Sequence, residues 1–122
     1  MSKRVLIIEN EPWLSERYEQ TLRHANFEVV STSNAYSAID IVDEQRPDAI
    51  VMGLTLSGVG GLGLLHELQS YSDTAVIPVV VCGSSSEKLS LEELQPYGVR
   101  QLLDIATMQP RDVAAAVRSA LA

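Results

Sequence analysis

The chain lacks the features that mark secreted, disulfide-stabilised or membrane proteins. It has 122 residues and one cysteine, Cys82, so an internal disulfide is excluded. Cys82 stands in an apolar run, which favours a buried hydrophobic role over a redox role. No apolar run approaches the roughly 20 residues that a membrane-spanning helix needs. The chain also enters an apolar strand almost at once, without the pattern of a signal peptide. We therefore expect a cytoplasmic protein without membrane contacts.

Basic residues are few. Lysine and arginine number 9 against 16 acidic residues, which gives a formal net charge of −7. Binding to the phosphate backbone of nucleic acid needs clustered cations, and most of these are scattered. Arg100, Arg111 and Arg118 could form a small strip late in the chain, but ordinary solvated side chains are the favoured interpretation. We expect no nucleic-acid binding by this domain.

Apolar segments of strand length alternate with segments of helical period throughout the chain. The length suits one domain, residues 1–122, and there is no linker or internal repeat. Strand-helix alternation with short connections predicts an α/β fold, a three-layer (βα)5 doubly wound parallel sheet. The expected strands are 5–8, 27–32, 49–52, 79–82 and 99–103, and the expected helices are 11–25, 34–45, 61–71, 87–95 and 110–121.

The polarity of the five strands predicts their order. The first, third and fourth are apolar throughout, as strands covered on both faces are. The second carries Glu28 and the fifth carries Arg100, so these two belong at the edges. This fits the flavodoxin-like order 2-1-3-4-5, in which a crevice opens between the first and third strands. We expect Glu9, Asn10 and Gly53 to meet at that crevice.

Several helix starts are visible in the sequence. Pro12 and Pro110 suit a first helical turn, where the missing N–H costs nothing, and Asn34 suits an N-cap. The helix expected at 87–95 has two alternative starts, and the sequence does not choose between them. The alternatives are capping boxes formed by Ser84 with Glu87 or by Ser90 with Glu93.

The stretch 46–62, RPDAIVMGLTLSGVGGL, closely resembles the central part of receiver domains of bacterial two-component response regulators. The segments 3–12, 26–29 and 77–81 resemble the first, second and fourth strands of the same family. The resemblance runs from Arg4 to Leu121. It implies a CheY-like receiver fold and a role in phosphorelay signal transduction.

The resemblance also assigns a site. In the family, two acids after the first strand and an aspartate after the third hold Mg²⁺, and the aspartate accepts a phosphoryl group. A hydroxyl residue after the fourth strand and a lysine after the fifth then bind the phosphoryl oxygens. In this chain these positions carry Glu9 and Asn10, then Gly53, then Gly83 beside Ser84, and finally Ile105; an aromatic position on the fifth strand carries Leu102.

These departures predict a degenerate receiver. A carboxylate is a poor nucleophile toward an anionic phosphate, and it reacts only where a metal and a cation offset the developing charge. We expect no usual phosphorylation, no enzymatic activity, no cofactor and no bound metal. Two alternatives stay open: phosphorylation of a displaced residue, or a small molecule in the emptied crevice. Asp48 starts a strand at the wrong end of the sheet, while Asp104, Ser84 and Thr55 are each expected to cap or solvate a loop.

One glycine-rich motif points elsewhere. Residues 58–63 spell G-x-G-x-x-G before a helix, the fingerprint of dinucleotide-binding sites. The motif follows the third strand after a gap, and the next strand ends without a ribose-binding acid. We therefore interpret the glycines as a turn. His24 and His66 are isolated on helices and are expected to be surface residues.

The expected partners are proteins of a two-component or related signalling pathway. Receivers typically use the face formed by the fourth helix, fifth strand and fifth helix for output or dimerisation, which suggests an interaction face or a homodimer here. The sequence fits both a stand-alone receiver and the first module of a longer regulator. The candidate face comprises Lys88, Leu91, Glu92, Gln95, Arg100, Gln101, Leu102, Arg111 and Arg118.

Overall fold

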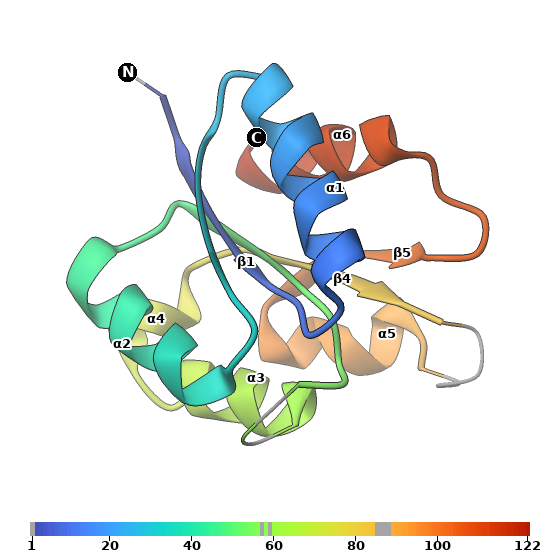
Figure 1. Ribbon diagram of the computed structural model, residues 1–122. Helices are drawn as coiled ribbons and strands as arrows, with labels where there is room; N and C mark the ends of the chain where they lie inside the picture. Colours follow the sequence, from blue (N-terminus) through green and yellow to red (C-terminus); the bar gives the residue numbers. More distant parts are fainter. Residues whose placement is uncertain (1, 57, 59, 85–88) are drawn as a thin grey trace.

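A five-stranded parallel sheet forms the centre of the computed structural model, which describes residues 2–56, 58, 60–84 and 89–122 (Figure 1). The strand order is β2-β1-β3-β4-β5, and every neighbouring pair is parallel. This confirms the expected fold class and strand order. The strands are β1 (Arg4–Ile8), β2 (Glu28–Thr32), β3 (Ala49–Met52), β4 (Val79–Gly83) and β5 (Val99–Asp104).

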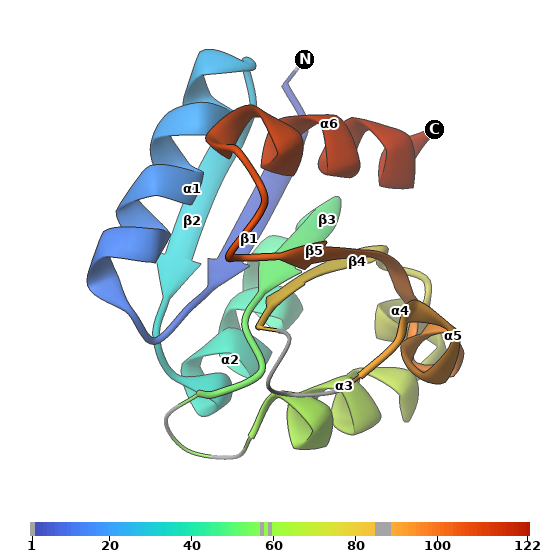
Figure 2. The same ribbon diagram turned by 90° about the vertical axis from the view of Figure 1, so that its right-hand side faces the viewer.

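Helices cover both faces of the sheet, which makes three layers (Figure 2). One face packs against α1 (Pro12–His24) and α6 (Pro110–Leu121). The opposite side carries α2 (Ala35–Gln45), α3 (Gly61–Gln69), α4 (Ser72–Ala75), α5 (Leu91–Leu94) and the 3-10 helix η2 (Gln95–Tyr97). Among the described residues, no helix combines the length and the apolar character needed to cross a bilayer.

Successive side chains of the central strands point alternately into two hydrophobic cores, one on each face of the sheet. Leu6 and Ile50 point to the side of α2 and α3, whereas Ile7 and Val51 point to α1 and α6. Successive side chains of a strand face opposite sides, so strands that are apolar at every position suit a sheet covered twice. Every residue of β3 and β4 is buried, while the edge strand β2 is only partly covered.

The helix starts follow the local sequence signals. Pro12 and Pro110 stand in the first turns of α1 and α6. The Asn34 side chain accepts hydrogen bonds from the backbone N–H groups of two residues in the first turn of α2, at 2.8 and 3.2 Å. Ser90 Oγ accepts from the Glu93 N–H at 3.2 Å, so the second of the two capping alternatives marks the start of α5. The first alternative involves Glu87, which lies outside the described residues.

Two helix extents predicted from the sequence are wrong. The helix expected over 61–71 ends at Gln69, and the separate turn α4 follows it. Thr74 holds that turn, because its hydroxyl donates to the Leu68 carbonyl oxygen at 2.5 Å. In place of the helix expected over 87–95 the structure has the single turn α5. Pro96 lacks the N–H that a continuing α-helix needs, so the chain continues as the 3-10 helix η2. The other ends agree with the expected ones or differ by one residue.

Candidate functional site

The carboxyl-terminal ends of β1, β3, β4 and β5 lie side by side, and this side of the sheet is called the carboxyl edge below. Gly53 N–H donates to the Ile8 carbonyl at 2.9 Å, and Ile105 N–H donates to the Gly83 carbonyl at 2.9 Å. Five of the six positions expected at the crevice, Glu9, Asn10, Gly53, Ser84 and Ile105, line one cavity of about 190 Å³. The sixth, Gly83, lines a neighbouring cavity of about 220 Å³ together with Ser84.

Glu9 occupies the space directly above Gly53. Its side chain is buried, with 6% of the residue exposed. One carboxylate oxygen, Oε2, accepts a hydrogen bond from the Glu11 N–H at 3.0 Å. The other, Oε1, lies 2.6 Å from where a Cβ atom on residue 53 would be. Any side chain at position 53 would therefore have to displace the Glu9 carboxylate.

Two buried polar side chains lie beneath this edge. The Tyr18 hydroxyl lies beside the Cys82 thiol, but within the described part of the chain it has no hydrogen-bond partner of standard geometry. Burial raises the pKa of Tyr18 well above its usual value. Burial also raises the pKa of the Cys82 thiol to about 12, and the Glu9 carboxylate adds to this rise. Both groups are therefore neutral at neutral pH, and neither is a reactive nucleophile.

Ile105 closes the β5 side of the crevice with an apolar wall. It also lines a second cavity, of about 160 Å³, together with Trp13, Leu14, Met108 and Pro110. The position to which the family resemblance assigns a lysine thus joins the crevice to an apolar socket between α1 and α6.

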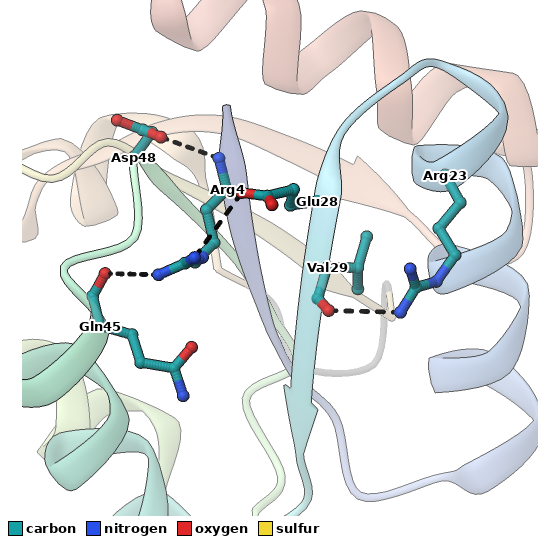
Figure 3. Close-up of polar contacts among 6 residues, drawn as sticks. All are labelled: Arg4, Arg23, Glu28, Val29, Gln45 and Asp48. Carbon is teal, nitrogen blue, oxygen red and sulfur yellow. Dashed lines mark hydrogen bonds and ion pairs between the residues drawn. The ribbon is translucent and has the colours of Figure 1, made fainter. Parts of the chain in front are cut away.

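The two aspartates considered as substitutes at the site each accept a hydrogen bond from a backbone N–H group. Asp104 Oδ1 accepts from the Ala106 N–H at 2.9 Å, which closes the turn after β5. Asp48 Oδ2 accepts from the Arg4 N–H at 2.8 Å at the opposite edge of the sheet (Figure 3). Thr55 is exposed on the wall of the crevice.

Backbone conformation and packing account for two glycines of the stretch 58–63: Gly58, the first glycine of the motif, and Gly61, which stands at one of its x positions. Gly58 has a φ of +88°, a left-handed conformation that favours glycine. A Cβ on Gly61 would lie 2.6 Å from the Leu54 Cα atom, so the start of α3 needs a residue without a side chain. Val59 lies outside the described residues. These observations support the interpretation as a turn.

The members of the candidate interaction face lie on α5, η2, β5 and α6. Leu91 and Leu102 pack against the core and are partly buried. The exposed members are Glu92, Gln95, Arg100, Arg111 and Arg118, and Gln101 is partly buried. Lys88 lies outside the described residues.

Two arginines of this set are directed differently. Arg100 Nη1 donates to the Ala120 carbonyl at 2.8 Å, so its side chain lies along the end of α6. Arg111, at the start of α6, lines a groove of about 780 Å³ with residues of α1 that include Arg17 and His24. Arg111 therefore faces α1 as well as solvent.

Sequence reasoning missed this groove and the socket beside it. A signal was present: Arg17, Thr21 and His24 recur at helical spacing, on a side of the helix away from the apolar stripe that contains Tyr18. The exposure of Trp13, 56%, was not foreseeable from its apolar character.

The residues at the crevice do not fit a magnesium site. Mg²⁺ requires nearly octahedral coordination by hard oxygen ligands, usually including carboxylates. One carboxylate oxygen of Glu9 accepts from the Glu11 N–H and the other lies over Gly53. The neighbouring side chain that could offer an oxygen to a metal is the amide of Asn10, not a carboxylate. Across the described ranges, no three acidic, histidine or cysteine side chains gather closely enough to hold a metal ion.

The comparisons with known proteins place the chain in a family. A family model, the response regulator receiver domain, matches residues 5–117. The chain therefore belongs to the response regulator receiver domains, which are signalling modules.

Curated relatives of different length resemble this chain. The polar-differentiation response regulator DivK of Brucella anthropi is 26% identical over 111 residues, which cover 91% of this chain and 90% of DivK. The transcriptional regulatory protein BaeR of Escherichia coli O6:H1 is 30% identical over 118 residues, covering 97% of this chain but 48% of BaeR. TcrX of Mycobacterium tuberculosis is 35% identical over 66 residues, which cover 54% of this chain and 28% of TcrX. The match thus spans half or less of these two larger proteins.

Solved structures share the fold. The chemotaxis response regulator CheY4 of Vibrio cholerae superposes with a TM-score of 0.87 at 18% identity, covering 99% of this chain and 100% of CheY4. The receiver domain of the sensor histidine kinase PA1611 from Pseudomonas aeruginosa superposes with a TM-score of 0.86 at 17% identity, over 99% of this chain and 98% of that domain. That structure has a magnesium ion coordinated in its active-site cleft. At these identities the likeness establishes the fold.

Proposed function

We propose that this receiver domain signals without phosphorylation of its crevice, by binding protein partners of a two-component or related pathway. One observation carries the proposal. Gly53, at the position of the family's acceptor aspartate, has no side chain, and the Glu9 carboxylate fills the space where one would project. A phosphoryl group would meet a buried carboxylate there instead of a nucleophile and its metal.

The rest of the crevice supports this proposal. Attack on a phosphoryl group needs positive charge near the equatorial oxygens. Ile105 contributes an apolar wall where the family has a lysine, and Gly83 offers no hydroxyl. The donor set of Glu9 and Asn10 does not fit the magnesium ion that the PA1611 receiver coordinates. The departures act as a set, because Ile105 replaces the family's lysine while Asn10 and Gly53 replace two of its three acids, so positive and negative charge are removed together.

Intact-mass measurement after incubation with acetyl phosphate and Mg²⁺ tests the proposal. We expect the mass of the chain to stay unchanged, while a receiver that carries the aspartate gains a phosphoryl group in parallel. A phosphoryl adduct on this chain would overturn the proposal. Mapping the adduct would then decide between Asp104, Ser84 and Thr55 as displaced acceptors, and Asp104→Asn is the first variant to compare.

The cavity volume argues against a small-molecule function for the crevice. Sites for small ligands usually enclose about 300 to 1,000 Å³. The cavity at Gly53 measures about 190 Å³, and Glu9 fills the part above Gly53; the cavity of about 220 Å³ that shares Leu54 and Ser84 with it is not lined by Gly53. A thermal-shift screen should therefore find no ligand whose effect is abolished by Gly53→Ala.

Dimerisation through α5, β5 and α6 is the accompanying proposal for self-association. The exposed charges Glu92, Arg111 and Arg118 are of mixed sign, as in a moderate protein interface. Sedimentation analysis of the chain and of the double variant Arg111→Glu/Arg118→Glu tests it. A dimer that survives both charge reversals would exclude this face.

A further inference from the structure

A groove between α1 and the start of α6 gathers positive charge. It has a volume of about 780 Å³ and is lined by Arg17, Gln20, Thr21, Arg23, His24 and Arg111, with Pro110 at one end. The two helices pack against the same face of the sheet (Figure 2). The groove is therefore built from two elements held rigidly by the core.

The charge of this groove is opposite to that of the whole chain. Three of the 9 lysine and arginine residues line it, in a chain with a formal net charge of −7. The charge of Arg23 is offset by an ion pair with Glu19 at 3.0 Å, and its guanidinium also donates to the Val29 carbonyl at 3.4 Å, a contact that Figure 3 shows. Arg17 and Arg111 are exposed at the groove. Electrostatic potentials of opposite sign on the two surfaces of an interface attract and orient a partner.

The groove continues into the apolar socket defined above by Trp13, Ile105 and Met108. Arg17 and Pro110 line both cavities, so the two form one surface. Trp13 is 56% exposed, which is unusual for so large an apolar side chain. Tryptophan, tyrosine and arginine are enriched among the residues that dominate binding energy at protein interfaces.

We propose that this surface binds an acidic, amphipathic segment of a partner protein. A bulky apolar side chain of that segment enters the socket between Trp13 and Met108, and its carboxylates face Arg17 and Arg111. The proposal rests on the proposed function and names the surface and the partner class that such signalling would use. Ile105 keeps the socket apolar, whereas a lysine there would place an ammonium beside the anchor.

A protein segment fits this surface better than nucleic acid does. A backbone-binding protein needs a series of phosphate contacts, and a net charge of −7 opposes them. The socket adds apolar contact area, which a phosphate backbone does not use. Carboxylates spaced around an apolar anchor match both parts of the surface at once.

Selection of random displayed peptides against the whole chain tests the partner class. We expect enrichment of peptides that combine aspartate or glutamate with a large apolar residue. Trp13 is the only tryptophan of the chain, so binding should change the intrinsic fluorescence directly. Failure to enrich any binder, or enrichment of neutral or basic peptides, would overturn the proposal.

Matched charge reversals locate the binding surface. With the enriched peptide carrying a fluorescent label, Arg17→Glu and Arg111→Glu should each weaken binding by about tenfold. Lys3→Glu makes the same charge reversal at an exposed position that neither lines the groove nor belongs to the candidate interaction face, and its effect should stay below about twofold. Trp13→Ala should weaken binding while the circular dichroism spectrum stays unchanged.

The outcomes separate this inference from the proposed function. Equal weakening by Lys3→Glu and Arg17→Glu would reject the groove and leave phosphorylation-independent signalling intact. Concentration-dependent self-association that Arg17→Glu abolishes in the absence of peptide would identify a second copy as the occupant and would also reject the proposal. A phosphoryl adduct in the mass measurement would instead remove the proposed function.

Discussion

The amino-terminal ends of the strands, the amino edge of the sheet, differ from the carboxyl edge in how they hold charge. At the amino edge, Arg4 makes polar contacts with three other segments near solvent. At the carboxyl edge, Glu9 is buried above Gly53 and beside apolar side chains. The Arg4 N–H donates to Asp48 and its guanidinium donates to the Gln45 carbonyl at 3.1 Å (Figure 3). The guanidinium also lies 3.7 Å from a Glu28 carboxylate oxygen.

The two edges therefore use charge differently. At the amino edge the charges face opposite charges or backbone groups, and water screens whatever remains unbalanced. At the carboxyl edge the groups beneath Glu9 are the neutral Tyr18 and Cys82, and the wall is Ile105. A new charge should be tolerated at the first edge and costly at the second, because desolvation without a partner is unfavourable.

The largest effect is expected for Gly53→Asp. The new carboxylate would meet Glu9 Oε1, because a Cβ there already lies at 2.6 Å from it. We expect a loss of about 3 kcal/mol in the free energy of unfolding, measured by urea denaturation at neutral pH. The loss should shrink toward about pH 4, since protonation of one of two adjacent carboxylates removes their repulsion.

Two control variants separate charge from size. Gly53→Ala adds only the Cβ and should cost about 1 kcal/mol, because the end of a glutamate side chain can shift. Glu9→Gln combined with Gly53→Asp should recover much of the stability. Equal losses for Gly53→Ala and Gly53→Asp would show that the carboxyl edge is not selective for charge.

An alkaline loss of stability is the next effect. The Cys82 thiol has its pKa raised from 9.0 to about 12 in the folded chain, so between these values the unfolded chain binds fewer protons. The free energy of unfolding should therefore be fully retained below pH 9.0 and fall above it. The slope is about 1.4 kcal/mol per pH unit, followed by urea denaturation.

Cys82→Ala is the control for this slope. It should remove the fall that begins near pH 9.0. The fall due to Tyr18 should remain, because its folded-state pKa is also raised and its unfolded value is 10.0. An unchanged curve in the Cys82→Ala variant would mean that the thiol is not the group that titrates.

A smaller effect is expected at the amino edge. Asp48→Ala removes the acceptor of the Arg4 N–H and should lower the free energy of unfolding by about 1 kcal/mol. Asp48→Asn keeps an acceptor oxygen and should cost less. A loss as large as that of Gly53→Asp would contradict the difference between the two edges.

The smallest effect is expected for Asp73→Asn. Asp73 pairs with Arg46 at 2.5 Å, which lowers the pKa of this carboxyl, but both side chains are more than half exposed. Exposed ion pairs are screened by water and contribute little. The urea midpoint at neutral pH should match that of the unchanged chain within error, and a clear decrease would show that this pair is structural.

Much of the fold could be predicted because its signals are local. Apolar strands, Pro12 and Asn34 depend on periodicity or on groups within one turn, and each lies where expected. The helix α4 was not predicted, because the contact that holds it joins the Thr74 hydroxyl to the Leu68 carbonyl six residues earlier, which no local signal indicates. That Glu9, Asn10 and Gly53 line one cavity follows from the same strand order, which places β1 beside β3.

The amino-acid sequence by itself determined the layered sheet and the residues that stand at its carboxyl edge, since the period of apolar residues and the strand polarity are enough for both. The tertiary structure alone decided that Glu9 lies over Gly53 and that Arg17 and Arg111 share one groove. The physical reason is that these relations depend on side-chain directions and on the distance between elements far apart in the chain, which periodicity does not encode.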